Sequence, residues 1–191
     1  MLNQNFTPPS VFQRLFEATQ LMGFTMASDP LTCNLLRGLA ASKPGGDFLE
    51  LGSGTGLSTA WLLDGMNETA TLTTVDNDPK VLSVLNRHLG EDPRLKVICA
   101  DGDEFLQQAQ NQFFDFIFAD TWSGKYRLLD EALSMVKPGG FYVIDDMLPQ
   151  ANWPAGHAQK VESLLKKMNS LTEWHTTTLN WASGVVIAVR R

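Results

Sequence analysis

A buried strand runs directly into a glycine-rich turn in the segment from Phe48 to Thr59, which reads FLELGSGTGLST. The apolar residues before the turn predict a strand over residues 47–51, and those after it predict a helix over residues 56–64. Glycine at positions 52, 54 and 56 tolerates positive φ and lets another group come close to the backbone. A strand, a glycine loop and a helix in this order make up the nucleotide-binding unit of a doubly wound sheet.

The rest of the chain continues the alternation of strands and helices. Further strands are predicted over residues 71–75, 95–99, 114–119 and 141–144, and a closing hairpin over residues 175–180 and 184–189. Helices are predicted over residues 78–89, from 103, over 125–136 and over 157–168. This order predicts an α/β, Rossmann-like fold: a doubly wound seven-stranded sheet, mostly parallel, with one antiparallel strand from the C-terminal hairpin and helices on both faces.

Two helices are expected before the first strand. One follows Pro8-Pro9, with Ser10 and Gln13 in the spacing of a capping box, and the other begins at Asp29-Pro30 and ends near residue 43. The 191 residues suit one domain with a single sizeable core. We expect residues 1–43 to contribute to a substrate pocket or to form a dimer face.

Composition limits the partners of the chain. A net charge of −6 disfavours a general nucleic-acid surface, which needs a basic footprint. No apolar run approaches the roughly 20 residues of a membrane helix, and the first residues lack the pattern of a secretory signal. We therefore expect a cytoplasmic protein that acts on a small molecule.

Acidic residues recur where the predicted parallel strands end. They are Glu50, Asp76, Asp101, Asp120 and the adjacent pair Asp145 and Asp146. The carboxyl ends of parallel strands meet at one edge of the sheet, which is where ligands bind in such folds. Asp76 follows Gly56 by 20 residues, the spacing at which an acid receives ribose hydroxyls. Each acid alone is also explained as a loop residue or a helix cap.

The glycine loop differs from the dinucleotide pattern G-x-G-x-x-G because its third glycine comes one residue early. Glu50-x-Gly52-x-Gly54-x-Gly56 resembles the first motif of class I S-adenosylmethionine (SAM)-dependent methyltransferases, and the segments 75–78 and 99–103 resemble the following two. The resemblance implies SAM as cofactor, with Asp76 on the ribose, Asp101 near the adenine amine, and Glu50 and the loop beside the methionine portion. It assigns to the cofactor the residues Met26, Ser28, Glu50, Gly52, Ser53, Gly54, Gly56, Ser58, Asp76, Asn77, Asp101, Gly102 and Asp120. For Ser28, helix capping is an equally good explanation.

The fourth and fifth predicted strands narrow the resemblance. Residues 114–126 and 137–146 resemble the catechol- and caffeoyl-CoA-type O-methyltransferases, and the likeness extends from about residue 22 to 189. In that family, residues matching Asp120, Asp145 and Asp146 bind a divalent cation, for which carboxylate oxygens suit Mg²⁺, Ca²⁺ or Mn²⁺.

Two positions depart from the family pattern. Asp146 stands where the family has asparagine, and Lys125 lies five rather than three residues after Asp120. Lys125 matches the family's lysine base if it reaches the same place, and is otherwise a solvated lysine. The expected catalytic residues are Asp120, Lys125 and His157. His157 ends the segment 147–157, which we interpret either as an acceptor lid with a histidine base or as a loop leading into a helix. Trp122 and Trp153 are candidates for stacking on the acceptor.

The sequence therefore predicts a SAM-dependent O-methyltransferase for a small hydroxylated acceptor, with metal assistance left open. Three alternatives remain at this point. One is a tRNA-modifying methyltransferase, which the acidic pI of about 5.0 disfavours. Another is an NAD(P)-dependent oxidoreductase, which the glycine spacing disfavours. The last is a SAM-binding protein without catalysis.

Overall fold

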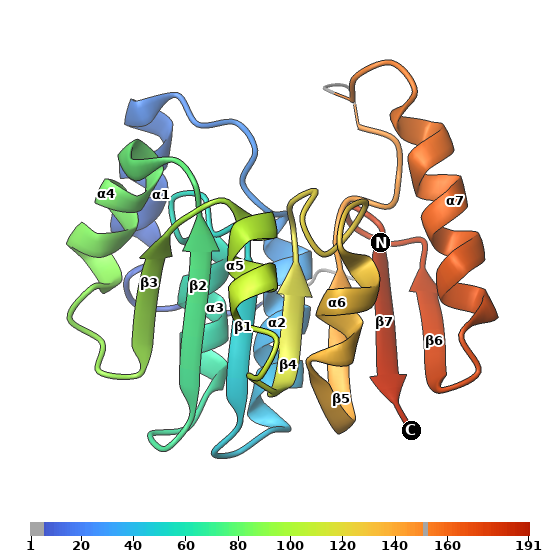
Figure 1. The fold of residues 1–191 in the computed structure, drawn as a ribbon. Coiled ribbons are helices and arrows are strands. Elements are labelled where there is room, and N and C mark those ends of the chain that lie inside the picture. The colour runs from blue at the N-terminus through green and yellow to red at the C-terminus, as the bar shows by residue number, and fades with distance from the viewer. Residues whose placement is uncertain (1–5, 151–152) are drawn as a thin grey trace.

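A seven-stranded sheet divides the protein into two layers of helices in the computed structural model, which describes residues 6–150 and 153–191 (Figure 1). The elements follow in the order α1 (Phe12–Met22), α2 (Pro30–Ala41), β1 (Asp47–Leu51), α3 (Leu57–Gly65), β2 (Thr71–Asp76), α4 (Pro79–Leu89), β3 (Leu95–Cys99), α5 (Gly102–Gln108), β4 (Phe114–Ala119), α6 (Leu129–Ser134), β5 (Val136–Ile144), α7 (His157–Ser170), β6 (Trp174–Leu179) and β7 (Val185–Arg190). Of the predicted acceptor segment 147–157, residues 151 and 152 lie outside the described residues.

The strand order is β3-β2-β1-β4-β5-β7-β6. Strands β1 to β5 are parallel, and β7 is antiparallel to both of its neighbours. The predicted fold class is confirmed, including the single antiparallel strand of the closing hairpin. The order reverses between β1 and β4, the position at which open parallel sheets bind ligands.

The register of the sheet brings three strand ends to one level. Leu51 on β1 pairs with Val75 on β2 and with Ala119 on β4. Two further backbone bonds extend the alignment past the strands, because the Gly52 amide donates to the Val75 carbonyl and the Asp120 amide donates to the Leu51 carbonyl, both at 2.9 Å. The residues that follow β1, β2 and β4 are therefore neighbours in space.

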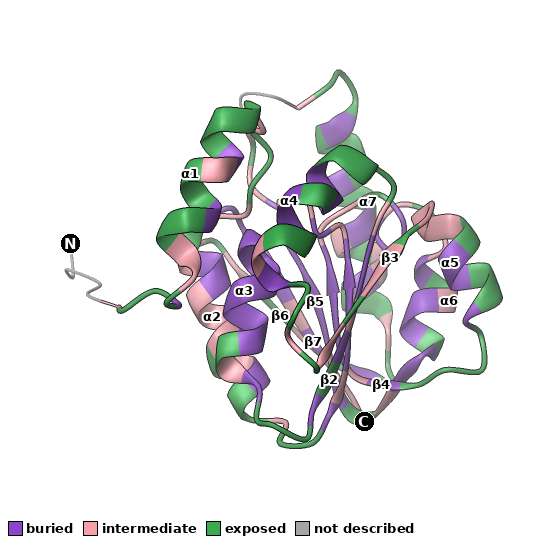
Figure 2. Ribbon diagram, turned by 90° about the vertical axis from the view of Figure 1, so that its left-hand side faces the viewer, coloured by how far each residue is buried: buried purple, intermediate pink, exposed green. Residues whose placement is uncertain are grey.

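Side chains alternate along the strands and form two apolar cores, one on each face of the sheet. Figure 2 shows the largely buried central strands between the helices. Phe48 and Phe116 face the layer formed by α1 to α4, whereas Leu49 and Ile117 face α5, α6 and α7. All four side chains are buried. Burial on both faces explains why the central strands read as apolar runs rather than as alternating patterns.

Several local predictions were wrong. The Ser10 capping box does not form, because α1 begins one residue later than that motif requires, with Val11 at the cap, and Gln13 bonds to Glu17 instead.

The helix predicted from residue 125 begins at Leu129. Gly124 and Leu128 adopt positive φ, of 76° and 51°, which a continuous helix does not accommodate.

Strand β5 also differs from its prediction, since it begins at Val136 rather than at Phe141. Val136 pairs with Phe114, and the register then shifts before Phe116, so the Pro138-Gly139-Gly140 stretch is accommodated as an irregularity in the strand. Within the described residues, no helix is long and apolar enough to cross a membrane.

Candidate active site

The glycine loop between β1 and α3 has the backbone conformation that its sequence requires. Gly52, Gly54 and Gly56 have φ values of 92°, 51° and 94°. A Cβ atom on Gly52 would lie 2.8 Å from the Asp120 carbonyl oxygen, so only glycine lets β1 and β4 end side by side. A Cβ atom on Gly56 would instead meet Leu85 of α4 at 2.9 Å. Gly56 therefore serves helix packing and lies outside the cavity.

Glu50 lies behind the loop rather than in the cavity wall. Its carboxylate is fully buried and accepts hydrogen bonds from the Ser58, Thr59 and Thr74 hydroxyls at 2.6, 2.5 and 2.6 Å. Burial raises the pKa of Glu50, and the three hydroxyls partly offset this effect. The structure thus gives Glu50 the task of joining β1 and β2 to the first turn of α3, in place of the expected contact with a ligand.

A cavity of about 280 Å³ lies against the outer side of the loop. Nine of the residues predicted to bind the cofactor line it: Met26, Ser28, Gly52, Ser53, Gly54, Ser58, Asp76, Asn77 and Asp120. Phe24 and Val81 also line it, and sequence reasoning missed both, because an apolar side chain near a glycine loop has no distinctive pattern. Asp76 accepts from the Gly54 amide at 2.8 Å and the Asp78 amide at 3.0 Å, which fixes its carboxylate at the rim.

Asp101 and Gly102 lie outside this cavity, contrary to expectation. The Asp101 carboxylate caps α5 by accepting from the amides of Asp103 and Glu104 at 2.8 and 3.4 Å. A Cβ atom on Gly102 would lie 2.6 Å from the Ser123 Cβ atom, so this turn packs against the loop after β4. The alternative explanation of Asp101 as a helix cap is the one that the geometry supports.

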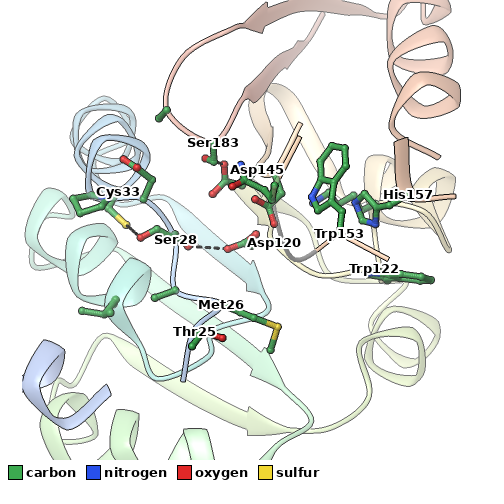
Figure 3. A pocket seen from close by; sticks show the side chains of 18 of the residues that line it. Thr25, Met26, Ser28, Cys33, Asp120, Trp122, Asp145, Trp153, His157 and Ser183 are labelled. Atoms are coloured by element: carbon green, nitrogen blue, oxygen red, sulfur yellow. Dashed lines mark hydrogen bonds between the residues drawn. The ribbon is translucent and has the colours of Figure 1, made fainter. Parts of the chain in front are cut away.

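A second cavity, of about 540 Å³, adjoins the first (Figure 3). Its walls come from α1, the segment between α1 and α2, the ends of β4 and β5, and the start of α7. Phe12 and Phe16 bring the N-terminal helix into this wall. The two cavities share Met26, Ala27, Ser28, Leu57 and Asp120. The Ser28 hydroxyl donates to Asp120 at 2.7 Å, so the shared wall is held by a bond between distant segments.

His157 lies in the second cavity at the first position of α7. Its side chain is 6% exposed, and Nε2 lies 3.1 Å from the Tyr126 hydroxyl. Its Nδ1 is buried and has no hydrogen-bond partner within residues 6–150 and 153–191. Burial and the nearby Lys125 charge lower the pKa of His157, so the imidazole is neutral at pH 7.

Aromatic rings surround this histidine. The Trp153 ring lies 4.4 Å from the imidazole centroid, Tyr126 lies 5.2 Å away and Trp122 lies 6.1 Å away. Trp122 and Trp153 both line the cavity, in agreement with their predicted places. A flat face beside an unpartnered ring nitrogen suits an acceptor that carries both a planar portion and a polar group.

The acids after β4 and β5 all line the second cavity, but they are engaged separately. Asp120 bonds to Ser28, whereas Asp145 accepts from the Ser183 hydroxyl, which in turn bonds to Thr32 at 2.9 Å. Burial and the charge of Asp145 raise the pKa of Asp120, and burial raises the pKa of Asp145 to about 6. Asp146 has a φ of 62°, an uncommon conformation that asparagine and aspartate tolerate.

These residues do not fit the predicted metal site. A hard cation needs several carboxylate oxygens that converge on one point. In the described part of the chain, no group of three His, Cys, Asp or Glu side chains is arranged to hold a metal ion. The donor chemistry of Asp120, Asp145 and Asp146 is suitable, but serine hydroxyls already engage one oxygen of Asp120 and one oxygen of Asp145.

Known proteins are similar to this chain in sequence and in fold. Residues 49–147 match the family described as "Methyltransferase domain". A protein of Mycolicibacterium paratuberculosis with the provisional name O-methyltransferase is 28% identical over 174 residues, which cover 86% of this chain and 78% of the relative.

Two solved structures are similar in fold. The O-methyltransferase from Bacillus cereus in complex with SAH has a TM-score of 0.84 at 20% identity and covers 100% of this chain and 94% of its own. TomG from Streptomyces achromogenes, an O-methyltransferase in complex with SAM, has a TM-score of 0.83 at 17% identity, with 98% and 92% covered. With a family match that spans more than half of its residues, the chain belongs to the methyltransferase-domain family.

Proposed function

We propose that the protein is a SAM-dependent O-methyltransferase that acts on a small hydroxylated molecule. The observation that carries the proposal is the pair of adjoining cavities with a common wall at Ser28 and Asp120. The cavity on the glycine loop suits the methyl donor, and the cavity lined by aromatic rings suits the acceptor. A methyl transfer needs two such sites in contact, because donor and acceptor atoms must meet in line.

The donor cavity has the features that a nucleoside with a methionine tail requires. Asp76 is positioned to receive ribose hydroxyls, and the Gly52–Gly54 backbone offers a surface without side chains. The segment containing Met26 and Ser28 covers the opposite side of the cavity, where the methionine end would lie. The names of relatives, which include SAM- and SAH-bound O-methyltransferases, support this assignment.

His157 serves as the general base in this proposal. The acceptor hydroxyl gives its proton to the His157 imidazole, its oxygen forms a bond to the methyl carbon, and the carbon–sulfur bond breaks with its electron pair on sulfur. The products are a methyl ether, S-adenosylhomocysteine and a protonated imidazole that returns its proton to water. The Tyr126 hydroxyl, 3.1 Å from Nε2, orients the imidazole in the cavity wall.

Alignment of the two reactants supplies most of the acceleration. Holding two reactants in line contributes up to about 7–11 kcal/mol to catalysis, and the common wall is where this alignment occurs. Asp120 lines both cavities. Its hydrogen bond to Ser28 fixes the wall against which the two reactants would be held. Metal assistance, which the family resemblance suggested, has no part in this scheme because the carboxylates do not converge.

The test is turnover with SAM carrying a labelled methyl group and a panel of small phenols and alcohols. We expect label in an ether product for at least one acceptor, and SAH in equal amount. Asp76→Ala, which removes the ribose contact, is the matched loss-of-donor variant. Label on nitrogen or carbon of the product, or no transfer while SAM binds tightly, would exclude O-methylation as the activity.

A further inference from the structure

Lys125 is a buried cation in the acceptor cavity that lacks an ion-pair partner. Its side chain belongs to a residue that is 5% exposed, and it lines the cavity together with Asp120, Asp145 and Asp146. Across residues 6–150 and 153–191, its ammonium group makes no salt bridge within 4.0 Å and no hydrogen bond, and Nζ lies over the Tyr126 ring at 5.5 Å from the ring centroid. A buried lysine without an anionic partner is rare and calls for a functional explanation.

The charge of Lys125 affects the pKa values of two of the acids that were expected to bind a metal ion. It lowers the pKa of Asp120 and that of Asp145, against the larger effect of burial on each carboxyl group. Lys125, Asp120 and Asp145 line the same cavity, and Lys125 makes no salt bridge to either carboxylate. A cavity with three acids already contains a cation of its own.

The loop after β4 is built to place Lys125 there. Gly124, with its φ of 76°, lies so close to the core that a Cβ atom would be 2.8 Å from Leu51 and from the Tyr142 hydroxyl. The Tyr142 hydroxyl donates to the Gly124 carbonyl, and the Gly124 amide donates to the Arg127 carbonyl at 2.7 Å. These bonds anchor Gly124, the residue before Lys125. They fix the path of the loop that carries Lys125, which lies five residues after Asp120.

We propose that the Lys125 ammonium takes the place of the divalent cation that metal-dependent relatives use, so that methyl transfer by this protein requires no metal. This inference rests on the proposed O-methyltransferase function. The Lys125 ammonium attracts the acceptor oxygen, stabilises the negative charge that develops there as His157 takes the proton, and balances the charges of Asp120 and Asp145. Fixed charges of this kind stabilise a transition state without reorganising as the reaction proceeds.

Metal binding by the unmodified protein gives the first test, and it needs no variant. Chelator-treated protein is titrated with Mn²⁺, followed by electron paramagnetic resonance and calorimetry, with and without SAM. We expect no stoichiometric Mn²⁺ site and the same turnover in EDTA as in Mg²⁺. A single tight Mn²⁺ site, or turnover that EDTA abolishes and Mn²⁺ restores, would overturn the proposal.

Substitution of Lys125 gives the second test. Lys125→Met keeps the length of the side chain and removes its charge, and should lower kcat by about 10²-fold, the effect of losing one group that stabilises developing charge. SAM affinity should be unchanged, because Lys125 lines only the acceptor cavity. Lys125→Arg should recover part of the rate. Wild-type turnover in Lys125→Met would contradict the proposal.

A matched control is Lys166→Met, at an exposed lysine of α7 that pairs with Glu162; its kcat should equal that of the wild type. The SAM-induced rise in melting temperature reports whether Lys125→Met is folded. Should the protein fail to bind SAM at all, the proposed function fails. Should it bind SAM and methylate only with metal, this inference alone fails.

Discussion

Gly52 shows how one residue can link backbone conformation to the donor cavity. Its φ of 92° and the 2.8 Å approach of a hypothetical Cβ atom to the Asp120 carbonyl oxygen both exclude a side chain. We predict that Gly52→Ala lowers the free energy of unfolding by more than the roughly 1–3 kcal/mol of backbone strain alone, and that it abolishes SAM binding.

Gly139→Ala is the matched control for this prediction, because Gly139 also has positive φ, of 74°, but has no atom within 4 Å of the Cβ position. It should show the strain without the clash and keep its SAM affinity. Urea denaturation measures both costs. Equal destabilisation by the two substitutions would mean that the Asp120 carbonyl leaves room for a Cβ atom at position 52.

His157 should produce an acid limb in the pH dependence of turnover. Burial and the Lys125 charge lower the pKa of His157 below its usual value of 6.5, and the base acts in its unprotonated form. Turnover should therefore be level near pH 7–8 and fall as the pH drops through that lowered pKa. His157→Ala should reduce kcat by about 10²–10⁴-fold, the contribution of a general base, and remove the limb. An unchanged limb in His157→Ala would assign it to another group.

Single residues were predictable from sequence where a motif dictates backbone conformation. Gly52, Gly54, Asp76 and the acids after β4 and β5 line the cavities as the sequence predicted, because strand ends must meet at one edge of a parallel sheet. Glu50 and Asp101 do follow or end strands as predicted, but their carboxylates accept hydrogen bonds from neighbouring groups of the protein. The face of the sheet to which a strand side chain such as Glu50 points depends on the strand register. A carboxylate at the start of a helix, such as Asp101, caps that helix as readily as it binds a ligand.

At the scale of elements, α1 is tied to the glycine loop by two buried hydroxyls. Thr19 donates to the Leu15 carbonyl at 2.7 Å and lies 2.8 Å from the Thr55 hydroxyl, which is therefore the donor to Thr19. We predict a coupling free energy of about 0.5–1.5 kcal/mol between these side chains, the usual value for one hydrogen bond.

A double-mutant cycle with Thr19→Val and Thr55→Val measures this coupling through urea unfolding. The double variant should be less destabilised than the sum of the single variants, because each single change leaves one buried hydroxyl unpaired. Additive effects would show that α1 is held by its apolar contacts alone.

Element boundaries were predicted well for strands and poorly where tertiary contacts decide. Strand β3 and strand β4 have the predicted bounds, since each is a short apolar run between turn residues. The start of α6 was missed because residues 125–128 have ordinary helix propensity. What excludes a helix there is the anchoring of Gly124 by Tyr142, and that contact joins positions far apart in sequence.

At the scale of the whole molecule, the strand order creates the site. The reversal between β1 and β4 brings Gly52 beside Asp120 (Figure 1). The segment between α1 and α2 lines both cavities, and Gln150, Trp153, Pro154 and His157 line the larger one. The alternation of elements predicted this architecture, but not the separate engagement of Asp120 and Asp145. That engagement depends on Ser28 and Ser183, which no sequence pattern connects to the acids.

The most direct test of the central claim is a calorimetric titration of the protein with SAM, compared with Asp76→Ala and with NAD⁺ as a competing nucleotide. We predict one SAM site per chain, displaced by SAH, with affinity reduced at least about tenfold in Asp76→Ala, equivalent to one lost charge-assisted hydrogen bond. NAD⁺ should not bind. Tight NAD⁺ binding, or SAM binding that is indifferent to Asp76, would contradict the assignment of the glycine-loop cavity to the methyl donor.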